Sequence, residues 1–329
     1  MPAILLALLL AACGQAGTSA SSAATVNATS TPAPTATPPA FPVSVTDDEG
    51  TAVTISAEPQ HIVSLTPAAT EILFSIGAGD RVVAKVEDVA NFPPDAAAVP
   101  IVATFKGVDV EKIVSLDADL VVSGGAAFGQ GDAVEQLRRA NVPVLVVGPT
   151  TTSGVLNDIR FLGQATGEAS NAEALAAGMA SSFDAIRTAT AGAAHPKVLY
   201  EIDATGAIYT AAKGSFLEEL LTIAGAEPVT TASTSAYDIP LEQLVTANPD
   251  IILLGDAAYG VTADQVKARA GWKTIEAVKT GAIFPVDDIV ITRPGPRLIE
   301  GLIALVHAIH ADLVLPSLPP IGVPASAAP

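Results

Sequence analysis

Few residues of this chain could carry out catalysis, and their spacing suggests no reactive set. The histidines are scattered, and only His307 and His310 lie three positions apart, where they would either bind a metal together or lie on a solvated helix face. The phosphate-loop motif GxxxxGK(S/T) and the nucleophile motif GxSxG are both absent. Gly77-Ala-Gly79 follows a helical pattern, and Val82 stands where a dinucleotide-binding loop has its third glycine. The sequence therefore favours binding over catalysis, with an enzyme on a two-lobed scaffold as the alternative.

Two segments in the first half of the chain recur, in the same order, in the second half. The matched segments are 108–124 with 239–255, and 71–78 with 219–226. The first match makes Glu111 equivalent to Glu242, and the second makes Glu71 equivalent to Glu219. Two matches in the same order indicate two lobes of similar construction.

The elements that must position these residues alternate between strand and helix. Strand patterns occur at 61–65, 82–86, 119–123, 142–147, 197–202, 207–209, 251–254 and 283–286. Helix patterns begin at Pro67, with Thr66 as the N-cap, and occur at 108–115, 133–140, 216–224, 241–247 and 297–311. Residues 41–46 and 51–55 alternate around the turn 47–50 and predict a hairpin. This order predicts an α/β fold with two doubly wound lobes, each built on a mostly parallel sheet.

Between the lobes, residues 153–191 carry no strand pattern and are rich in alanine. They predict a helix at 153–165 and a longer one at 170–190, so that a single long α-helix joins the lobes. A helix of about 20 residues is about 30 Å long. Because such a strut is rigid, we expect the two lobes to close only slightly around a ligand.

The overall composition excludes several classes of function. The chain has 329 residues, 50% of them hydrophobic, and a net charge of −18 with an isoelectric point near 4.4. The acidic surplus argues against binding to nucleic acid or to anionic lipid surfaces. The single cysteine allows no intrachain disulfide, and no CxxC motif supports a structural zinc site. After position 12, no apolar run approaches the roughly 20 residues that a membrane-spanning helix needs.

The start of the chain has the features of an export and anchoring signal. Residues 4–12 are wholly apolar and lead directly to Cys13. The string Leu10-Ala-Ala-Cys13 resembles a bacterial lipobox, in which the cysteine is acylated; a buried cysteine near the terminus is the alternative. Residues 14–40 are rich in Ala, Ser, Thr and Pro, carry no charge, and predict a disordered tether.

These patterns together predict the organisation of the chain. The predicted parts are a signal peptide (1–12), a lipidated tether (13–40), an N-terminal lobe (41–152), connecting helices (153–192), a C-terminal lobe (193–313) and a disordered tail (314–329).

Five segments spread over residues 41–313 carry a family resemblance. They are His61-Ile-Val-Ser-Leu-Thr-Pro-Ala-Ala-Thr-Glu-Ile-Leu73, Asp109-Val-Glu-Lys-Ile-Val-Ser-Leu-Asp-Ala-Asp-Leu-Val-Val122, Leu241-Glu-Gln-Leu-Val-Thr-Ala-Asn-Pro-Asp250, Ala270-Gly-Trp272 and Arg293-Pro-Gly-Pro-Arg297. They resemble, in the same order, signatures of the helical-backbone substrate-binding proteins of ABC importers, which bind siderophores, haem and cobalamin. The resemblance implies a monomeric, lipid-anchored receptor that faces the periplasm or the cell exterior. It implies neither a catalytic residue nor a cofactor of its own.

The resemblance also implies partners. In this family, one glutamate on each lobe docks into basic pockets of the permease dimer, which works with ATPase subunits. The matching positions are Glu71 and Glu219, the pair that the internal repeat relates, with Glu218 as the alternative to Glu219. The remaining expected partners are a small metal chelate and, through Cys13, the membrane.

The resemblance places the ligand between the lobes, at the carboxyl ends of the strands, where doubly wound sheets bind ligands. The loops there supply the predicted ligand contacts Thr66, Phe105, Lys106, Phe128, Tyr209, Tyr237, Tyr259 and Arg293. Aromatic rings in such a cleft pack on a large planar ligand, and Arg293 would face an anionic group. Arg297 and Trp272 are assigned structural roles.

The identity of the chelate follows only loosely from the sequence. Haem binders commonly offer an axial Tyr or His, but residues 41–147 contain no tyrosine and only His61, which we expect at the buried start of a strand. Asn91-Phe-Pro-Pro94 and Thr104-Phe-Lys-Gly107 loosely resemble strings of cobalamin binders. We therefore expect cobalamin or another corrinoid before a ferric siderophore. A ligand-free anchored scaffold is a third hypothesis.

Overall fold

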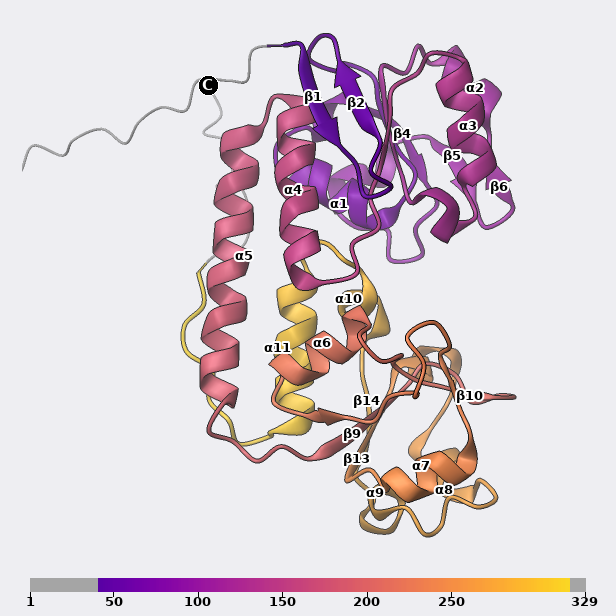
Figure 1. Ribbon diagram of the computed structural model, residues 1–329, viewed down its shortest axis with the longest axis vertical. Helices are drawn as coiled ribbons and strands as arrows, with labels where there is room; N and C mark the ends of the chain where they lie inside the picture. Colours follow the sequence, from indigo (N-terminus) through magenta and orange to yellow (C-terminus); the bar gives the residue numbers. More distant parts are fainter. Residues whose placement is uncertain (1–40, 320–329) are drawn as a thin grey trace, which may run out of the picture. The chain divides into compact units, whose positions relative to one another are not determined.

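The computed structural model describes residues 41–319 (Figure 1). The predicted signal peptide, Cys13 and the tether lie outside the described residues, as do residues 320–329. Leu315 and Leu318, in the part of the predicted tail that is described, are partly buried and pack against the core. No helix within 41–319 has the length and apolar character needed to cross a membrane.

The first sheet has six strands and a doubly wound order. In space, the strands are β6 (Gly107–Val108), β5 (Ile101–Thr104), β4 (Val82–Val86), β3 (Ile62–Ser64), β7 (Leu120–Ser123) and β8 (Val144–Val146). All neighbours are parallel except β5 and β6. The chain runs outward from β3 to β4 and β5, then returns to β7 on the other side of β3. The switch point between β3 and β7 is where such sheets commonly bind ligands.

Short helices connect these strands, and their ends follow the capping signals. They are η1 (Gly79–Arg81), η2 (Pro94–Ala98), η3 (Gly125–Phe128), α1 (Pro67–Ser75), α2 (Val110–Ser115) and α3 (Gly131–Arg139). The predicted N-cap is confirmed, because the Thr66 side chain accepts a hydrogen bond from Ala69 N at 3.1 Å. The predicted helix 108–115 begins later, since Asp109 caps it by accepting from Lys112 N at 2.9 Å and Val108 belongs to β6. The predicted hairpin is confirmed as β1 (Val43–Thr46) and β2 (Ala52–Ile55).

Two long helices follow the first sheet. They are α4 (Thr152–Thr166) and α5 (Ala169–Thr190), which has 22 residues and is therefore about 33 Å long. They pack side by side (Figure 1), and Gly163 allows the close approach because a Cβ there would collide with Ala172. Gly167, at a φ of 82°, ends α4 in the left-handed conformation that glycine adopts without strain.

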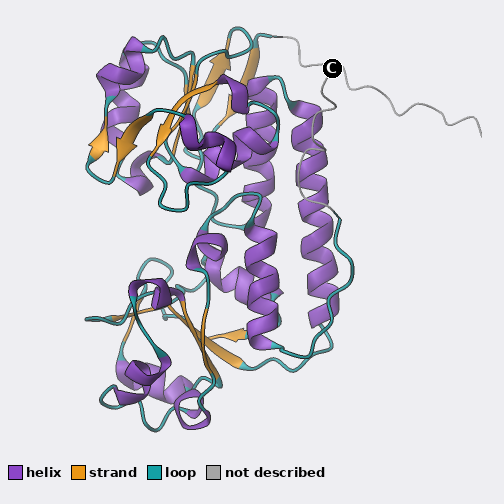
Figure 2. Ribbon diagram, turned by 180° about the vertical axis from the view of Figure 1, so that it is seen from behind, coloured by secondary structure: helices purple, strands orange, loops and turns teal. Residues whose placement is uncertain are grey.

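The second sheet has four parallel strands. In space, they are β11 (Glu227–Pro228), β9 (Lys197–Glu201), β13 (Ile251–Leu254) and β14 (Ile283–Pro285). A separate antiparallel pair is formed by β10 (Ile208–Tyr209) and β12 (Asp238–Ile239). The helices are α6 (Phe216–Ile223), α7 (Leu241–Ala247), η4 (Gly255–Tyr259), α8 (Ala263–Ala268), α9 (Glu276–Thr280), α10 (Asp288–Thr292) and α11 (Leu298–Ile309). Figure 2 shows helices around both sheets, as the predicted α/β class requires.

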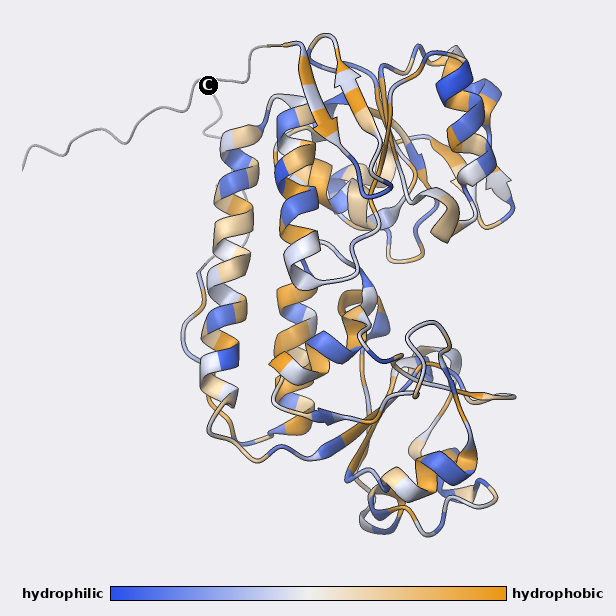
Figure 3. Cartoon of the chain, viewed as in Figure 1, coloured by the Kyte–Doolittle hydropathy of each residue, from blue (hydrophilic) through white to orange (hydrophobic). Residues whose placement is uncertain are grey.

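One hydrophobic core links the two sheets. It contains Leu73 of α1, Val198 of β9, Phe183 of α5 and Leu302 of α11, all of them buried. The helix α11 carries mostly apolar residues (Figure 3), and it packs against α5 and α10. Two smaller cores lie within the first and the second sheet region. Apolar burial at this shared core is the main term that stabilises the fold.

Candidate ligand-binding site

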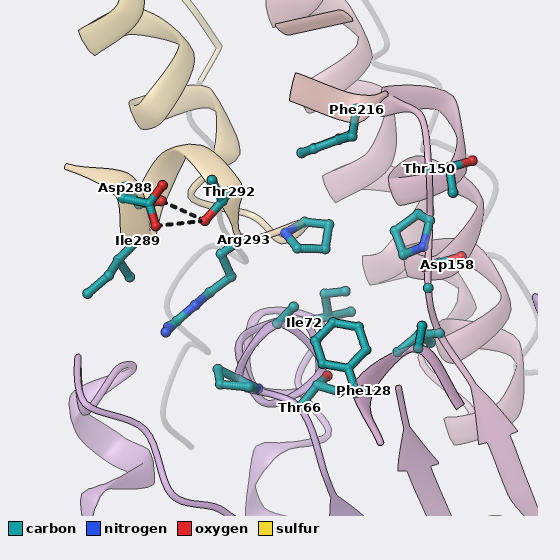
Figure 4. A pocket seen from close by; sticks show the side chains of 17 residues that line it. Thr66, Ile72, Phe128, Thr150, Asp158, Phe216, Asp288, Ile289, Thr292 and Arg293 are labelled. Carbon is teal, nitrogen blue, oxygen red and sulfur yellow. Dashed lines mark hydrogen bonds between the residues drawn. The ribbon is translucent and has the colours of Figure 1, made fainter. Parts of the chain in front are cut away.

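A cavity of about 470 Å³ lies at the carboxyl ends of the strands of the first sheet. Its 17 lining residues are Thr66, Pro67, Ala68, Ile72, Ala127, Phe128, Val147, Gly148, Pro149, Thr150, Asp158, Phe216, Asp288, Ile289, Thr292, Arg293 and Pro294. On one side they follow β3, β7 and β8 or belong to α4. On the other side they belong to α6, α10 and the segment after α10. Most are apolar, and Figure 4 shows Ile72, Phe128 and Phe216 on its walls.

The cavity includes three of the predicted ligand contacts, Thr66, Phe128 and Arg293. It does not include Phe105, Lys106, Tyr209, Tyr237 and Tyr259, which are all exposed. Phe105 and Tyr259 are the most open, with 95% and 86% of their surface accessible. Their role in binding stays a prediction.

A cluster of four charged side chains lies beside the cavity. Arg293 donates from Nη1 to Glu71 Oε1 at 2.7 Å and from Nη2 to Asp88 Oδ1 at 2.8 Å. Arg297 donates from Nη2 to Glu71 Oε1 at 2.7 Å, and its guanidinium stacks 3.9 Å from the centre of the Phe92 ring. The structural role predicted for Arg297 is thus confirmed.

This cluster is buried and balanced in charge. The Glu71 side chain is fully buried, and that of Asp88 nearly so. Burial disfavours the ionised form of Asp88, but the hydrogen bonds from Arg293 and from the Ala90 amide outweigh it and lower its pKa. Burial likewise opposes the charge of Arg293, yet the bonds to Asp88 and Glu71 raise its pKa. Two carboxylates and two guanidinium groups leave the cluster without net charge, as burial requires.

The contacts within this cluster oppose two predicted roles, docking to the permease by Glu71 and binding of an anionic ligand by Arg293. Glu71 is not on the surface, so docking through it requires its carboxylate to leave both arginines first. The expectation that Arg293 faces an anionic ligand meets a similar obstacle, because its terminal nitrogens already bind Glu71 and Asp88.

The repeat-related Glu219 also has internal partners. It accepts hydrogen bonds at 2.7 Å from both the amide and the hydroxyl of Thr152, the first residue of α4. A carboxylate there satisfies a free amide and complements the helix dipole. Its neighbour Glu218 accepts from Gly214 N. The matching positions of Glu71 and Glu219 thus each tie a lobe helix to another element.

Two carboxyl groups of the cavity were missed by sequence reasoning. Asp158 of α4 is 1% exposed, and burial, together with the charge of Asp48 and the hydrogen bond between them, raises its pKa to about 9. Burial also raises the pKa of Asp288, although bonds from Tyr200 and Thr292 oppose this. Asp158 could have been found, because it shares the apolar helix face of Val155, Ile159 and Leu162.

The second sheet holds its own charged group at its strand ends. Arg269 binds the buried carboxylate of Glu201 through two nitrogens and stacks 4.7 Å from the ring centre of Trp272. Trp272 is 3% exposed, which confirms its predicted structural role. Burial, then the charge of Glu201, raises the pKa of Asp256 to about 7.

His61 differs from the sequence-based expectation. It is exposed rather than buried, and its ring bonds the carbonyl of Asp117. It precedes β3, so it lies at the amino edge of the sheet, away from the carboxyl edge that borders the cavity.

Comparisons with known proteins agree with this geometry. The sequence profile of a family described as periplasmic binding protein matches residues 62–290. An uncharacterised ABC transporter substrate-binding lipoprotein of Bacillus subtilis is 35% identical over 83% of this chain and 87% of its own. A cobalamin-binding protein of Halobacterium salinarum is 29% identical over 82% of this chain and 75% of its own. A periplasmic haem-binding protein from Roseiflexus, solved in its apo form, is 26% identical and superimposes with a TM-score of 0.64 over 76% of this chain and 98% of its own.

We expect Glu71→Gln to lower the free energy of unfolding by about 3–5 kcal/mol, because it leaves two buried guanidinium groups with one carboxylate. Urea denaturation followed by circular dichroism measures this loss. The control is Glu111→Gln, an exposed glutamate in the first turn of α2, which should change stability by less than about 0.5 kcal/mol. Equal stability of the two variants would show that the buried cluster is not a structural requirement.

Proposed function

Since this chain belongs to the periplasmic binding protein family, we propose that it is the extracytoplasmic substrate-binding component of an ABC importer. It captures a metal chelate and delivers it to the permease, and the favoured ligand is cobalamin or another corrinoid. A ferric siderophore is the next candidate. Proteins of this family bind and deliver ligands and do not catalyse reactions, so the enzyme alternative is set aside.

The observation that carries the choice of ligand is the charge of the cavity. Among the described residues that line it, Arg293 is the one cation, and its guanidinium is already bound by Glu71 and Asp88. Asp158 and Asp288, which have raised pKa values, add no positive charge. An anionic group inside this cavity would therefore lose its hydration without gaining a cationic partner there. Cobalamin suits a lining without a free cation, because the edge of its corrin ring carries neutral amide groups.

The same cavity disfavours haem. Haem carries two propionates, and its iron takes an axial His, Tyr, Met or Cys ligand. Among the described residues that line the cavity, none is of these four types. His61 lies at the other edge of the sheet. The structural likeness to a haem-binding protein supports the shared fold, whereas the described lining offers haem no axial ligand inside the cavity.

We propose that only part of a corrinoid enters the cavity, whose volume is about 470 Å³. The rest of the ligand would contact side chains outside it. We propose that the exposed aromatic residues Phe105, Tyr209, Tyr237 and Tyr259, with Lys106, provide these contacts. Phe105, Lys106 and Tyr237 lie in loops. Tyr209 belongs to β10, and Tyr259 is the last residue of η4.

Titration calorimetry tests the ligand with cyanocobalamin, haemin, a neutral ferric hydroxamate and an anionic ferric catecholate. We expect one-site binding of cyanocobalamin and at least about tenfold weaker binding of haemin and the catecholate. Tighter binding of haemin or the catecholate would contradict the charge argument. No binding of any of the four would contradict the assignment to this class of importer.

Docking to the permease requires exposed groups on both lobes. Glu111 and Glu242 are exposed, stand in the first turns of α2 and α7, and are equivalent in the internal repeat. We propose that this pair, rather than the internally bonded Glu71 and Glu219, binds basic pockets of the permease dimer.

Uptake of labelled cobalamin by cells that carry one variant as their only copy tests this docking pair. Glu111→Ala with Glu242→Ala should reduce uptake at least about tenfold while the purified variant keeps its affinity for cobalamin. The matched control, Glu135→Ala with Glu227→Ala, removes one exposed glutamate from each sheet region and should transport normally. Normal uptake by the first double variant would reject the assignment.

The anchor is proposed from the sequence and one relative. Cys13 closes the apolar run 4–12, and the Bacillus subtilis relative is described as a lipoprotein. We expect the mature protein to begin at an acylated Cys13, and Cys13→Ala to leave the membrane fraction. A mature N-terminus without acyl groups in a mass spectrum would contradict this expectation.

A further inference from the structure

One side chain of the cavity has a hydrogen-bonding atom with no partner in the part of the chain that the structure describes. Asp158 lines the cavity from α4, and its Oδ1 atom is buried without a hydrogen-bond partner among the described residues. Its neighbours on the same helix face, Val155, Ile159 and Leu162, are fully buried and apolar. Because buried polar atoms nearly always have partners, this oxygen calls for an explanation.

The pKa of Asp158 depends first on its burial and then on Asp48, in the turn between β1 and β2. Asp48 of this turn donates its amide to Val146 O at 3.1 Å and accepts from Gly148 N at 2.7 Å, so it is fixed against the loop after β8. Burial, then the charge of Asp48 and its hydrogen bond to Asp158, raise the pKa of Asp158 to about 9, which favours its neutral form at neutral pH. Oδ1 has no partner among the described residues, so it is the oxygen with which Asp158 can accept a hydrogen bond from a ligand.

The other charged groups described around the cavity are bound to partners of their own or lie across from Asp158. Asp288 and Arg293 lie on the opposite wall of the cavity (Figure 4), and Arg293 is bound to Glu71 and Asp88. Glu219, near the start of α4, is bound to Thr152. The wall around Asp158 therefore offers a ligand an acceptor oxygen and a pair of acids with one negative charge.

We infer that Asp158 selects among ligands by the group at their edge. It accepts a hydrogen bond from a neutral amide N–H and disfavours a carboxylate at the same place. The inference rests on the proposed function. Oδ1 is covered in the ligand-free protein, so the bond forms as the ligand enters and the wall adjusts. A carboxylate there has no proton to donate, and it would lie beside the negative charge of the acid pair.

The test compares cyanocobalamin with its monocarboxylic derivatives, in which one peripheral amide is replaced by a carboxylate. Wild-type protein should bind at least one derivative about tenfold more weakly than cyanocobalamin. Asp158→Leu removes the acceptor and should weaken cyanocobalamin binding about tenfold while abolishing that difference. Asp158→Asn keeps a carbonyl acceptor, so its affinity for cyanocobalamin should stay within about threefold of wild type.

A second measurement verifies the protonation and the folding of the variants. Asp158 has a higher pKa in the folded than in the unfolded chain, so wild-type stability should fall as pH rises from about 4 to about 9. Asp158→Asn should make this decline smaller, while Asp256 and Asp288, whose pKa values are also raised, still contribute to it. Unchanged cyanocobalamin affinity in a folded Asp158→Leu variant would overturn the inference about Asp158 but not the proposed ligand. Failure of wild-type protein to bind any corrinoid overturns the proposed ligand and the inference together.

Discussion

The rest of the structure depends on the ion pairs that the buried carboxylate of Glu71 forms with Arg293 and Arg297. It stands on α1, directly after the strand at the switch point of the first sheet, and it binds two arginines that precede α11. A carboxylate without solvent is tolerated only when cations and hydrogen-bond donors surround it. Glu71 therefore ties the N-terminal sheet region to the last helix, whose apolar side chains belong to the core shared with the second sheet.

This arrangement determines the chemistry of the cavity. The one arginine that reaches the lining is held by two carboxylates, and the remaining carboxyl groups have raised pKa values. The cavity is thus apolar with a few hydrogen-bonding edges and without a free positive charge. A broad, neutral ligand with amide groups suits such walls better than a dianionic one. Selection by charge and selection by the Asp158 acceptor act in the same direction, because both disfavour ligand carboxylates.

The sequence predicted those helices, strands and caps that depend on local patterns of residues. The strands at 82–86 and 251–254, the helix at 241–247 and the Thr66 cap are confirmed, because apolar periodicity and capping are properties of neighbouring residues. The burial of Glu71 could not be predicted, since its partners lie 222 and 226 positions away in the chain. The short strands β6, β11 and β12 have two residues each, too few for a periodic signal. The repeat indicated equivalent glutamates, but which pair faces solvent depends on tertiary packing.

The most direct measurement is a crystal structure of the protein with cyanocobalamin bound. The account predicts a corrinoid edge in the cavity between Phe128 and Phe216, with Arg293 still bound to Glu71 and Asp88. An electron density map in which Arg293 has left both carboxylates to bind the ligand, or in which the ligand lies away from this cavity, would contradict it.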